Sequence, residues 1–410
     1  MSAAKRLLAY VIVLEPLWAP ILQSQVIDLL CSLPEARRKQ LFVLWFYRPD
    51  WLLRHGERIR ALEKLLGQHG IPLIKLPVLG RKHNARYWVA PLVALQVAFG
   101  LLYARARYRF TACHGRSYMP SLAVACLKRV GARLQLLFDP RSDFPEENVA
   151  NGRWTRASRN YRFWKAAEHL ILRQSDAVVA VTGAMLADLQ ASVPRDPAVL
   201  WRVIPNNYTA PHDSPPPTPP GRQGCVAPAL CYAGSIRHGY WNNVATYLSL
   251  LERILERRPT WQVTFLVHER QVQLLTEALQ ASQLPPASWN VASVNPKDVV
   301  ATLTACTVGL QVMRHRDSRM GVKVAEYLAA GLPVLTSENV LGAAEIVRQF
   351  DVGMVLDDDY GNLDEALAYI EDVFAHREQV RQRCRKVAQA TFSTQAVAGR
   401  YEAVYAELLP

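Results

Sequence analysis

The chain has 410 residues, of which half are hydrophobic and a fifth are charged. This composition excludes disordered and fibrous proteins, and the length favours two folded domains of about 200 residues each. Lys and Arg exceed Asp and Glu by 13, and the excess lies in the first half: residues 1–200 carry +15 and residues 201–410 carry −2. A positive charge excess of this size attracts anionic lipid or a phosphorylated substrate. Nucleic acid is not expected, because no recognition motif accompanies the charge.

The seven cysteines are odd in number and widely spaced, and none forms a CxxC pair. Neither a disulfide framework nor a zinc site is predicted, and a reducing compartment fits the chain. The first apolar run, Leu7–Leu14, is followed at once by Glu15 and Pro16, so we interpret it as a buried strand rather than a signal peptide. The run Tyr87–Ala104 has no charge over 18 residues. Pro91 near its start favours a buried or interfacial helix over a membrane span.

Short β-branched or aromatic runs alternate with longer helical patterns in residues 1–206, as in a doubly wound parallel sheet. The expected strands are Leu8–Leu14, Gln40–Phe46, Pro72–Pro77, Phe110–Cys113, Leu134–Phe138, Ala177–Val181 and Val203–Ile204. The expected helices are Ile21–Leu33, Glu57–Gln68, Pro91–Arg105, Pro120–Val130 and Trp164–Gln174. Residues 207–228 are rich in proline and glycine and form a predicted linker.

The same alternation returns in residues 229–390. The expected strands there are Ala229–Ala233, Gln262–Val267, Trp289–Ala292, Val308–Met313 and Val334–Thr336. The sequence therefore predicts two doubly wound Rossmann-like α/β domains that face an interdomain cleft, followed by a C-terminal helix in residues 391–410. Ligands of such sheets bind beyond the carboxyl ends of the strands, so each motif at a strand-to-helix junction is a candidate site.

One such junction follows the strand that ends at Met313. Its loop carries several cations, among them Arg319, and it leads through Gly321 to Lys323 at the start of a helix. Free backbone N–H groups and the helix dipole favour a phosphate at this point. Glu326 lies three residues after Lys323, on the same side of the helix, where ribose hydroxyls would satisfy its carboxylate. We predict a nucleoside diphosphate site; the alternative is a solvated Lys–Glu pair beside a basic loop.

Several segments resemble glycosyltransferase family 4, whose members are retaining enzymes of the GT-B fold. The segments similar to its donor domain are GSIR (Gly234–Arg237), VKVAEYLAAGLPVLTS (Val322–Ser337), AAEIV (Ala343–Val347) and DVGMVL (Asp351–Leu356). SDAVVAVTGAMLADL (Ser175–Leu189) and VIPNN (Val203–Asn207) are similar to the end of its first domain. The resemblance implies that the helix of residues 391–410 crosses back to the first domain.

The resemblance also implies roles for single residues. Glu326 matches the second glutamate of the family's Glu-x7-Glu motif, which holds the ribose, while the first falls at Ser318. The segment around Glu326 therefore indicates that a nucleotide is bound, but it does not indicate which sugar the nucleotide carries. Arg237 stands where the family places a basic diphosphate ligand. The predicted donor-binding residues are Gly234, Ser235, Arg237, Arg319, Gly321, Lys323 and Glu326.

Two residues of the first domain are candidate catalytic groups. Asp139 follows an expected strand, at the place where many members of the family carry a histidine, and we expect it nearest the reacting sugar, supported by Arg141 and Asp143. The alternative is an acidic loop capped against Arg141. His114, at the end of another strand, is the second candidate, and its alternative role is to bond the N-terminus of the next helix.

The expected function is transfer of a sugar from a nucleotide-sugar donor to a lipid-linked, oligosaccharide or polysaccharide acceptor in the synthesis of bacterial envelope glycans such as lipopolysaccharide, capsule or exopolysaccharide. The alternatives are a nucleotide-sugar epimerase of GT-B architecture and a catalytically silent GT-B scaffold. No cofactor or metal is expected, because the acids near Asp139 lack a DxD spacing and the spacing in Asp357–Asp359 reads as a solvated turn.

We expect a cytoplasmic protein bound peripherally to the inner face of the cytoplasmic membrane, because basic and aromatic residues gather in the first domain. The residues expected at its surface are Arg81, Lys82, Arg86, Tyr87, Trp88, Arg153, Trp154, Arg156, Arg159, Arg162, Trp164 and Lys165.

Overall fold

The computed structural model describes residues 8–80, 86–194, 196–208, 227–236, 243–295 and 298–409. The chain divides into two compact units. Unit 1 contains Met1–Val149, Arg153–Pro205 and Thr394–Pro410, and unit 2 contains Ala150–Gly152 and Asn206–Ser393. Most of the predicted linker, residues 209–226, lies outside the described residues. The last helix thus belongs to unit 1, although the chain that leads into it belongs to unit 2.

Unit 1 is built on a seven-stranded parallel sheet with the strand order β3-β2-β1-β4-β5-β6-β7. Its strands are β1 (Leu8–Val13), β2 (Leu41–Tyr47), β3 (Leu73–Pro77), β4 (Ala112–Arg116), β5 (Gln135–Asp139), β6 (Ala177–Ala180) and β7 (Leu200–Val203). Leu8 of β1 is in register with Leu41 on one side and with Ala112 on the other. Because β1 lies between β2 and β4, the strand order reverses there, and ligands of doubly wound sheets generally bind at such a switch point.

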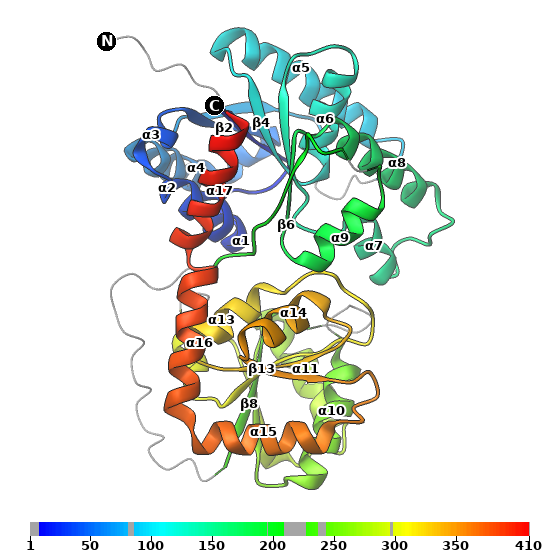
Figure 1. Ribbon diagram of the computed structural model, residues 1–410, viewed down its shortest axis with the longest axis vertical. Coiled ribbons are helices and arrows are strands. Elements are labelled where there is room, and N and C mark those ends of the chain that lie inside the picture. Colours follow the sequence, from blue (N-terminus) through cyan, green and yellow to red (C-terminus); the bar gives the residue numbers. More distant parts are fainter. Residues whose placement is uncertain are drawn as a thin grey trace. The chain divides into compact units, whose positions relative to one another are not determined.

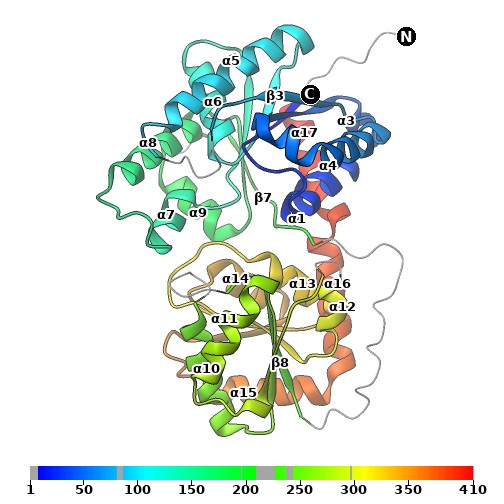
Figure 2. The same cartoon turned by 180° about the vertical axis from the view of Figure 1, so that it is seen from behind.

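Helices cover both faces of this sheet, so β1 and β2 are buried throughout and read as continuous apolar runs. Alternate residues of β1 point to opposite faces of the sheet and enter different hydrophobic cores. Val11 belongs to the core on one face, and Tyr10 belongs to the core on the other. The core with Val11 is closed by α5 (Ala90–Tyr108), α6 (Tyr118–Arg129), α8 (Arg159–Gln174) and α9 (Gly183–Ala191). The core with Tyr10 is closed by α1 (Pro20–Leu22), the π-helical η1 (Gln23–Asp28), α2 (Leu29–Cys31), α4 (Pro49–Gln68) and α17 (Thr394–Leu408), as Figures 1 and 2 show.

Two further helices of unit 1 are short: α3 (Glu35–Arg38) and α7 (Phe144–Ala150). The strand expected at Phe110–Cys113 runs instead over Ala112–Arg116, because its polar end residues His114 and Arg116 are buried in the sheet. Trp164, expected at the surface, is buried in the core between α8 and the sheet, so that expectation is wrong.

Unit 2 is built on a six-stranded parallel sheet with the order β10-β9-β8-β11-β12-β13. Its strands are β8 (Ala229–Ala233), β9 (Gln262–Leu266), β10 (Trp289–Ala292), β11 (Val308–Gln311), β12 (Val334–Ser337) and β13 (Gly353–Leu356). Its helices are α10 (Val244–Arg257), α11 (Glu269–Gln280), the 3-10 helix η2 (Pro286–Ser288), α12 (Val299–Leu303), α13 (Val322–Ala330), α14 (Leu341–Phe350), α15 (Leu363–Ala375) and α16 (Arg377–Phe392). The predicted fold class, two doubly wound Rossmann-like sheets, is confirmed.

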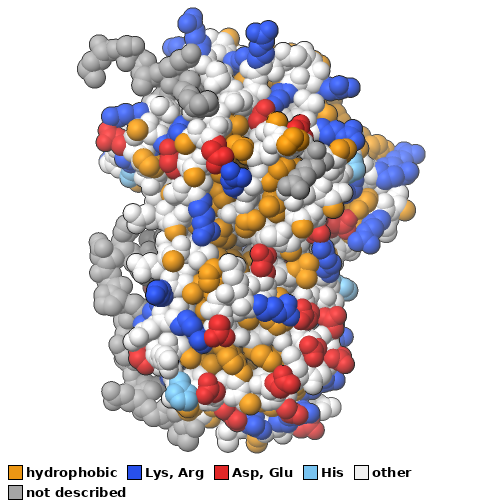
Figure 3. All heavy atoms as spheres, in the orientation of Figure 1, with side chains coloured by type: hydrophobic (Ala, Val, Ile, Leu, Met, Phe, Trp, Pro, Cys, Tyr) orange, Lys and Arg blue, Asp and Glu red, His pale blue; other side chains and the backbone are white. Residues whose placement is uncertain are grey.

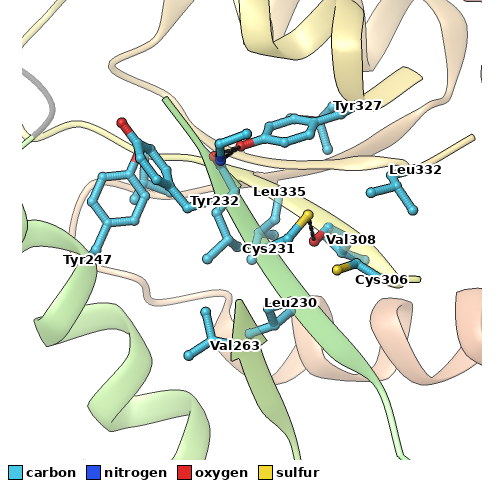
Figure 4. Packing of buried hydrophobic residues seen from close by; sticks show 14 of the residues in the cluster. Leu230, Cys231, Tyr232, Tyr247, Val263, Cys306, Val308, Tyr327, Leu332 and Leu335 are labelled. Carbon is cyan, nitrogen blue, oxygen red and sulfur yellow. Dashed lines mark hydrogen bonds between the residues drawn. The ribbon is translucent and has the colours of Figure 1, made fainter. Parts of the chain in front are cut away.

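The core of unit 2 holds α13 in place at the switch point between β8 and β11. The Tyr327 ring lies over Gly309, where a Cβ atom would come within 2.3 Å of the ring. Its hydroxyl group donates a hydrogen bond to the Leu310 carbonyl (3.1 Å) and accepts one from the backbone N–H of Ala233 (2.9 Å). Figure 4 shows this core, with the rings of Tyr232 and Tyr247 side by side at a centroid distance of 4.6 Å. Tyr327 therefore ties α13 to both β8 and β11, the strands whose ends form the candidate site.

Candidate active site

The carboxyl ends of β8 and β11 meet at the start of α13. The chain leaves β8 through Gly234, whose φ of 136° is unfavourable for residues with a side chain. A Cβ atom there would lie 3.0 Å from Nζ of Lys323. The backbone conformation therefore favours glycine at this turn, and a side chain there would also crowd the lysine.

Lys323 is the second residue of α13, and its side chain is buried. Its Nζ donates a hydrogen bond to the Tyr232 hydroxyl group (2.9 Å) and lies 4.1 Å from the centroid of that ring. The Tyr232 hydroxyl in turn donates to the Ser235 carbonyl (2.8 Å). Burial lowers the pKa of Lys323 to about 7, against a smaller opposing effect of the Glu326 carboxylate. Tyr232 thus holds the ammonium group through both its hydroxyl group and its aromatic ring.

Glu326 follows one turn later and is half-buried. Burial raises the pKa of its carboxyl group, and the nearby Lys323 ammonium only partly opposes this rise. The charged forms of both residues are therefore disfavoured in the structure. A ligand that offered phosphate oxygens to Lys323 and hydroxyl groups to Glu326 would favour both charged forms.

Gln311, the last residue of β11, was missed by the sequence analysis. It is fully buried, and among the described residues neither its Oε1 nor its Nε2 atom has a hydrogen-bond partner. A Cβ atom on Gly321, the N-cap of α13, would lie 3.3 Å from its Oε1. The signal that could have found it is a polar residue at the end of the otherwise apolar strand VGLQ. We call Tyr232, Gln311, Lys323 and Glu326 the α13 cluster.

The other predicted donor-binding residues lie in different settings. Arg319 forms a two-pronged ion pair with Asp317, with Nε–Oδ1 and Nη2–Oδ2 distances of 2.9 and 2.8 Å. Its charge is therefore already compensated within the loop. Ser235 is exposed, and Arg237 lies outside the described residues. The donor-binding roles of these three residues stay predictions.

In unit 1 the two candidate catalytic residues lie side by side at the ends of β4 and β5. His114 Nε2 is 3.2 Å from Asp139 Oδ2, and His114 Nδ1 is 2.7 Å from the Tyr405 hydroxyl oxygen. A carboxylate only accepts hydrogen bonds, so Nε2 carries the proton and Nδ1 accepts from Tyr405. The alternative partner of His114, the N-terminus of the next helix, is not the one that the structure shows.

Asp139 collects further contacts from α17 and from its own loop. Its Oδ2 accepts a hydrogen bond from the Tyr401 hydroxyl group (2.9 Å) and lies 3.5 Å from Arg141 Nη1. Burial alone would raise the pKa of Asp139, but the Arg141 guanidinium and the His114 hydrogen bond lower it to about 2. Burial lowers the pKa of His114, and the Asp139 carboxylate only partly opposes this. The pair therefore consists of a carboxylate and a neutral imidazole.

We call His114, Asp139, Arg141, Tyr401 and Tyr405 the α17 cluster, because the two tyrosines are on α17. His114 and Asp139 are 0% and 1% exposed, so elements of unit 1 enclose both. The contacts within this cluster are enough to explain why His114 and Asp139 are buried. Their catalytic roles therefore stay predictions.

Asp143, expected to support Asp139, belongs to another group of charges. Burial and the nearby Glu168 carboxylate raise its pKa to about 7, and Lys165 opposes this. Glu168 is itself buried and accepts a hydrogen bond from the Tyr118 hydroxyl group (2.5 Å) and one from Lys165. Of the two expected supports, only Arg141 contacts Asp139.

The described residues contain no group of three or more His, Cys, Asp and Glu side chains placed to hold a metal ion. The acidic run Asp357–Asp359 is exposed at a turn after β13. The expectation that no metal or cofactor takes part stays a prediction.

Both units have the Rossmann-like fold, with the candidate sites at the carboxyl ends of parallel strands. Residues 30–207 match the family described as "Glycosyl transferase 4-like domain", and residues 230–391 match "Glycosyl transferases group 1". The chain therefore belongs to the glycosyltransferases that join these two domain families, and it is a nucleotide-sugar glycosyltransferase of the GT-B class. The resemblance to glycosyltransferase family 4 is confirmed.

Solved structures with the same fold cover nearly the whole chain. Sucrose-phosphate synthase from Thermosynechococcus elongatus is 16% identical with a TM-score of 0.68, and 98% of this chain and 99% of that chain are covered. HepE from Anabaena in complex with UDP-glucose is 15% identical with a TM-score of 0.64, at the same coverage. The lipopolysaccharide outer core galactosyltransferase WaaB is 11% identical with a TM-score of 0.64, again at 98% and 99% coverage. The sequence has no significant match among curated proteins.

Proposed function

We propose that this chain transfers a sugar, with retention of configuration, from a nucleoside diphosphate sugar to a lipid-linked or polysaccharide acceptor. The observation that carries the donor part is the α13 cluster, in which the buried ammonium group of Lys323 bonds to the Tyr232 hydroxyl group at the start of α13 and the half-buried Glu326 lies one turn later. Lys323 and the free N–H groups of α13 bind the diphosphate, and Glu326 accepts from the ribose hydroxyl groups. Gly234 and Gly321 allow the backbone to approach, and Ser235, Arg237 and Arg319 complete the set.

The chemistry that this site supports is stabilisation of the leaving diphosphate. Positive charge from Lys323 and from the N-terminus of α13 offsets the negative charge that grows as the sugar departs. A phosphate oxygen accepts the proton of the acceptor hydroxyl, so the reaction needs no buried protein base. We therefore assign no proton transfer to His114 or Asp139, which unit 1 encloses.

The acceptor side of the proposal rests on unit 1. Its strongly basic sequence suits an anionic lipid-linked acceptor at the inner face of the cytoplasmic membrane, in the synthesis of bacterial envelope glycans. WaaB, one of the similar structures, is named a lipopolysaccharide outer core galactosyltransferase. Its name supports the same class of acceptor.

The test is a panel of nucleotide sugars incubated with the full chain, in which the release of free nucleotide and any change of the sugar are both measured. Release of nucleotide with one donor supports the proposal. Interconversion of the sugar without release indicates an epimerase, and no reaction with any donor indicates a silent scaffold.

The placement of the donor is tested separately by calorimetric titration of the nucleotide. Glu326→Ala is expected to weaken nucleoside diphosphate binding about tenfold or more, because it removes a charged hydrogen-bond partner of the ribose. Glu365→Ala, on the exposed face of α15 in the same unit, is the matched control and leaves binding unchanged. Equal affinity of Glu326→Ala and the wild type would place the donor elsewhere.

A further inference from the structure

Helix α5 is apolar on two opposite sides. One side is buried in the core of unit 1 through Ala90, Val93, Ala94, Val97, Ala98, Leu101 and Ala104. The other side exposes large apolar residues at helical spacing, just before and along α5: Trp88, Leu92, Leu95, Phe99, Leu102 and Tyr103. Their exposed fractions run from 42% to 64%. A surface helix of a water-soluble domain usually presents polar residues on this side, so the exposed stripe requires an explanation.

The buried side fixes α5 firmly, and so fixes the direction of the exposed stripe. At Gly100 the helix runs so close to the sheet that a Cβ atom would lie 2.4 Å from the Phe46 ring. The Gln96 amide accepts a hydrogen bond from the Leu79 N–H (2.9 Å) and donates one to the Leu79 carbonyl (3.2 Å). This holds Leu79, which is 74% exposed, next to the helix. Leu79 and the six exposed residues form what we call the α5 apolar face.

The stretch of sequence that contains this face carries charge of one sign. Between Glu63 and Asp139 the sequence has no acidic residue, and it has 12 Lys and Arg residues. Exposed arginines flank the helix, with Arg86 before it and Arg107 and Arg109 at its end. On the side drawn in Figure 3, Lys and Arg side chains gather over the part of unit 1 that contains α5 and α8. An apolar stripe with a cationic border matches the interface of a membrane with anionic lipids.

We propose that the α5 apolar face inserts into the surface of an anionic lipid bilayer, with α5 lying in the plane of the membrane. The apolar side chains enter the boundary of the acyl chains, Trp88 and Tyr103 sit at the headgroup level, and the arginines contact lipid phosphates. In the described part of the chain no helix is long and apolar enough to cross a membrane. The inference rests on the proposed function in one respect, since it brings unit 1 to the membrane that holds a lipid-linked acceptor.

A second copy of this chain is a poorer occupant of the same face. Two such faces brought together would bring their flanking arginines together as well, and no acidic residue of this region is available to compensate them. The bilayer instead supplies the opposite charge.

The test is co-sedimentation of the full chain with phosphatidylglycerol–phosphatidylcholine vesicles and with pure phosphatidylcholine vesicles. The wild type is expected to bind the anionic vesicles, and the double variant Leu95→Gln/Phe99→Gln to bind them at least about tenfold more weakly, because two inserted side chains are lost. Leu53→Gln, which changes a 90% exposed leucine on α4 of the same unit, is the matched control and binds as the wild type. Arg107→Glu is expected to weaken binding to anionic vesicles only.

Two results would overturn the inference: equal vesicle binding by the wild type and by Leu95→Gln/Phe99→Gln, or a wild-type dimer that this double variant converts to a monomer while neither binds lipid. Circular dichroism shows whether each variant is folded. Nucleotide binding without vesicles is measured in parallel and stays unchanged in the double variant. A wild type that binds nucleotide but no anionic vesicles would contradict this inference alone, and a wild type that binds the vesicles but no nucleotide would contradict the donor proposal alone.

Discussion

The α17 cluster of unit 1 and the α13 cluster of unit 2 both lie at the carboxyl ends of strands in their sheets, yet their polar groups differ in how they are satisfied. In the α17 cluster the Asp139 carboxylate is compensated by Arg141 and accepts from Tyr401 and His114, although its Oδ1 has no hydrogen-bond partner among the described residues. In the α13 cluster Lys323 is buried against an aromatic ring and Gln311 is buried with its amide unpaired within the described chain.

The difference separates polar residues that stabilise a fold from those that await a ligand. A buried charge with an opposite charge and hydrogen bonds beside it has its desolvation offset by the protein. A buried ammonium without that compensation shifts its pKa instead, and a bound anion would restore the charged form. The predictions below test this contrast, beginning with the largest effect.

Asp139→Ala is expected to lower the free energy of unfolding by about 3–5 kcal/mol, because it removes a buried carboxylate that faces the Arg141 guanidinium and accepts from His114 and Tyr401. The measurement is urea unfolding followed by circular dichroism. Glu407→Ala is the control, since it removes a carboxylate of α17 that forms an exposed ion pair with Arg202 and that contributes about 0–1 kcal/mol. An Asp139→Ala protein of wild-type stability that no longer releases nucleotide would assign Asp139 a catalytic role.

Lys323→Met is expected to weaken nucleoside diphosphate binding by about 10- to 100-fold while the free energy of unfolding stays the same or rises. The variant keeps the apolar stem but removes a charged hydrogen-bond donor to the diphosphate. Titration calorimetry with the nucleoside diphosphate of the donor identified in the nucleotide-sugar panel measures the affinity, and Lys386→Met, which changes an exposed lysine on α16, is the control. A large loss of stability in Lys323→Met would show that the ammonium group supports the fold.

The pH dependence of binding follows from the pKa of about 7 of Lys323 in the free protein. A bound diphosphate favours the ammonium form and raises this pKa, so binding takes up a proton above pH 7. Affinity should therefore fall with rising pH from about 7, by up to about tenfold per pH unit. Calorimetry in buffers of different ionisation enthalpy measures the proton uptake. The slope should vanish in Lys323→Met, and an equal slope in that variant would assign it to another group.

The same shift predicts the effect of pH on stability without ligand. The unfolded lysine keeps its proton up to its ordinary pKa of 10.5, whereas the folded one loses it near 7. The unfolded state therefore binds more protons between these values, and the contribution of Lys323 to stability rises with pH across that window. Urea unfolding of the wild type and Lys323→Met at a series of pH values tests this difference.

Tyr405→Phe is expected to have the smallest effect, a loss of about 1 kcal/mol, since it removes one hydrogen bond to the neutral imidazole of His114. Tyr401→Phe, which removes a donor to the Asp139 carboxylate, should cost about 2 kcal/mol. Urea unfolding of both variants measures which of the two losses in stability is larger. Neither substitution should change nucleotide binding. A larger effect of Tyr405→Phe than of Tyr401→Phe would contradict the charge assigned to the pair.

The sequence by itself determined the alternation of strands and helices and the two Rossmann-like sheets, and it led to the predicted donor motif at the start of α13. These depend on local patterns, since the period of apolar residues and the glycines at strand ends are visible within a few residues. Lys323 and Glu326 were predicted because three residues on a helix place them on one side.

The tertiary structure alone decided which polar residues are paired and which apolar faces are covered. Tyr401 and Tyr405 reach Asp139 and His114 across 262 and 291 residues of sequence, so no local pattern could show that these two candidates are enclosed. The run of α5 is apolar all round, and only its packing against the sheet shows which side remains exposed. Burial and pairing depend on residues far apart in the chain, and for that reason they require the folded structure.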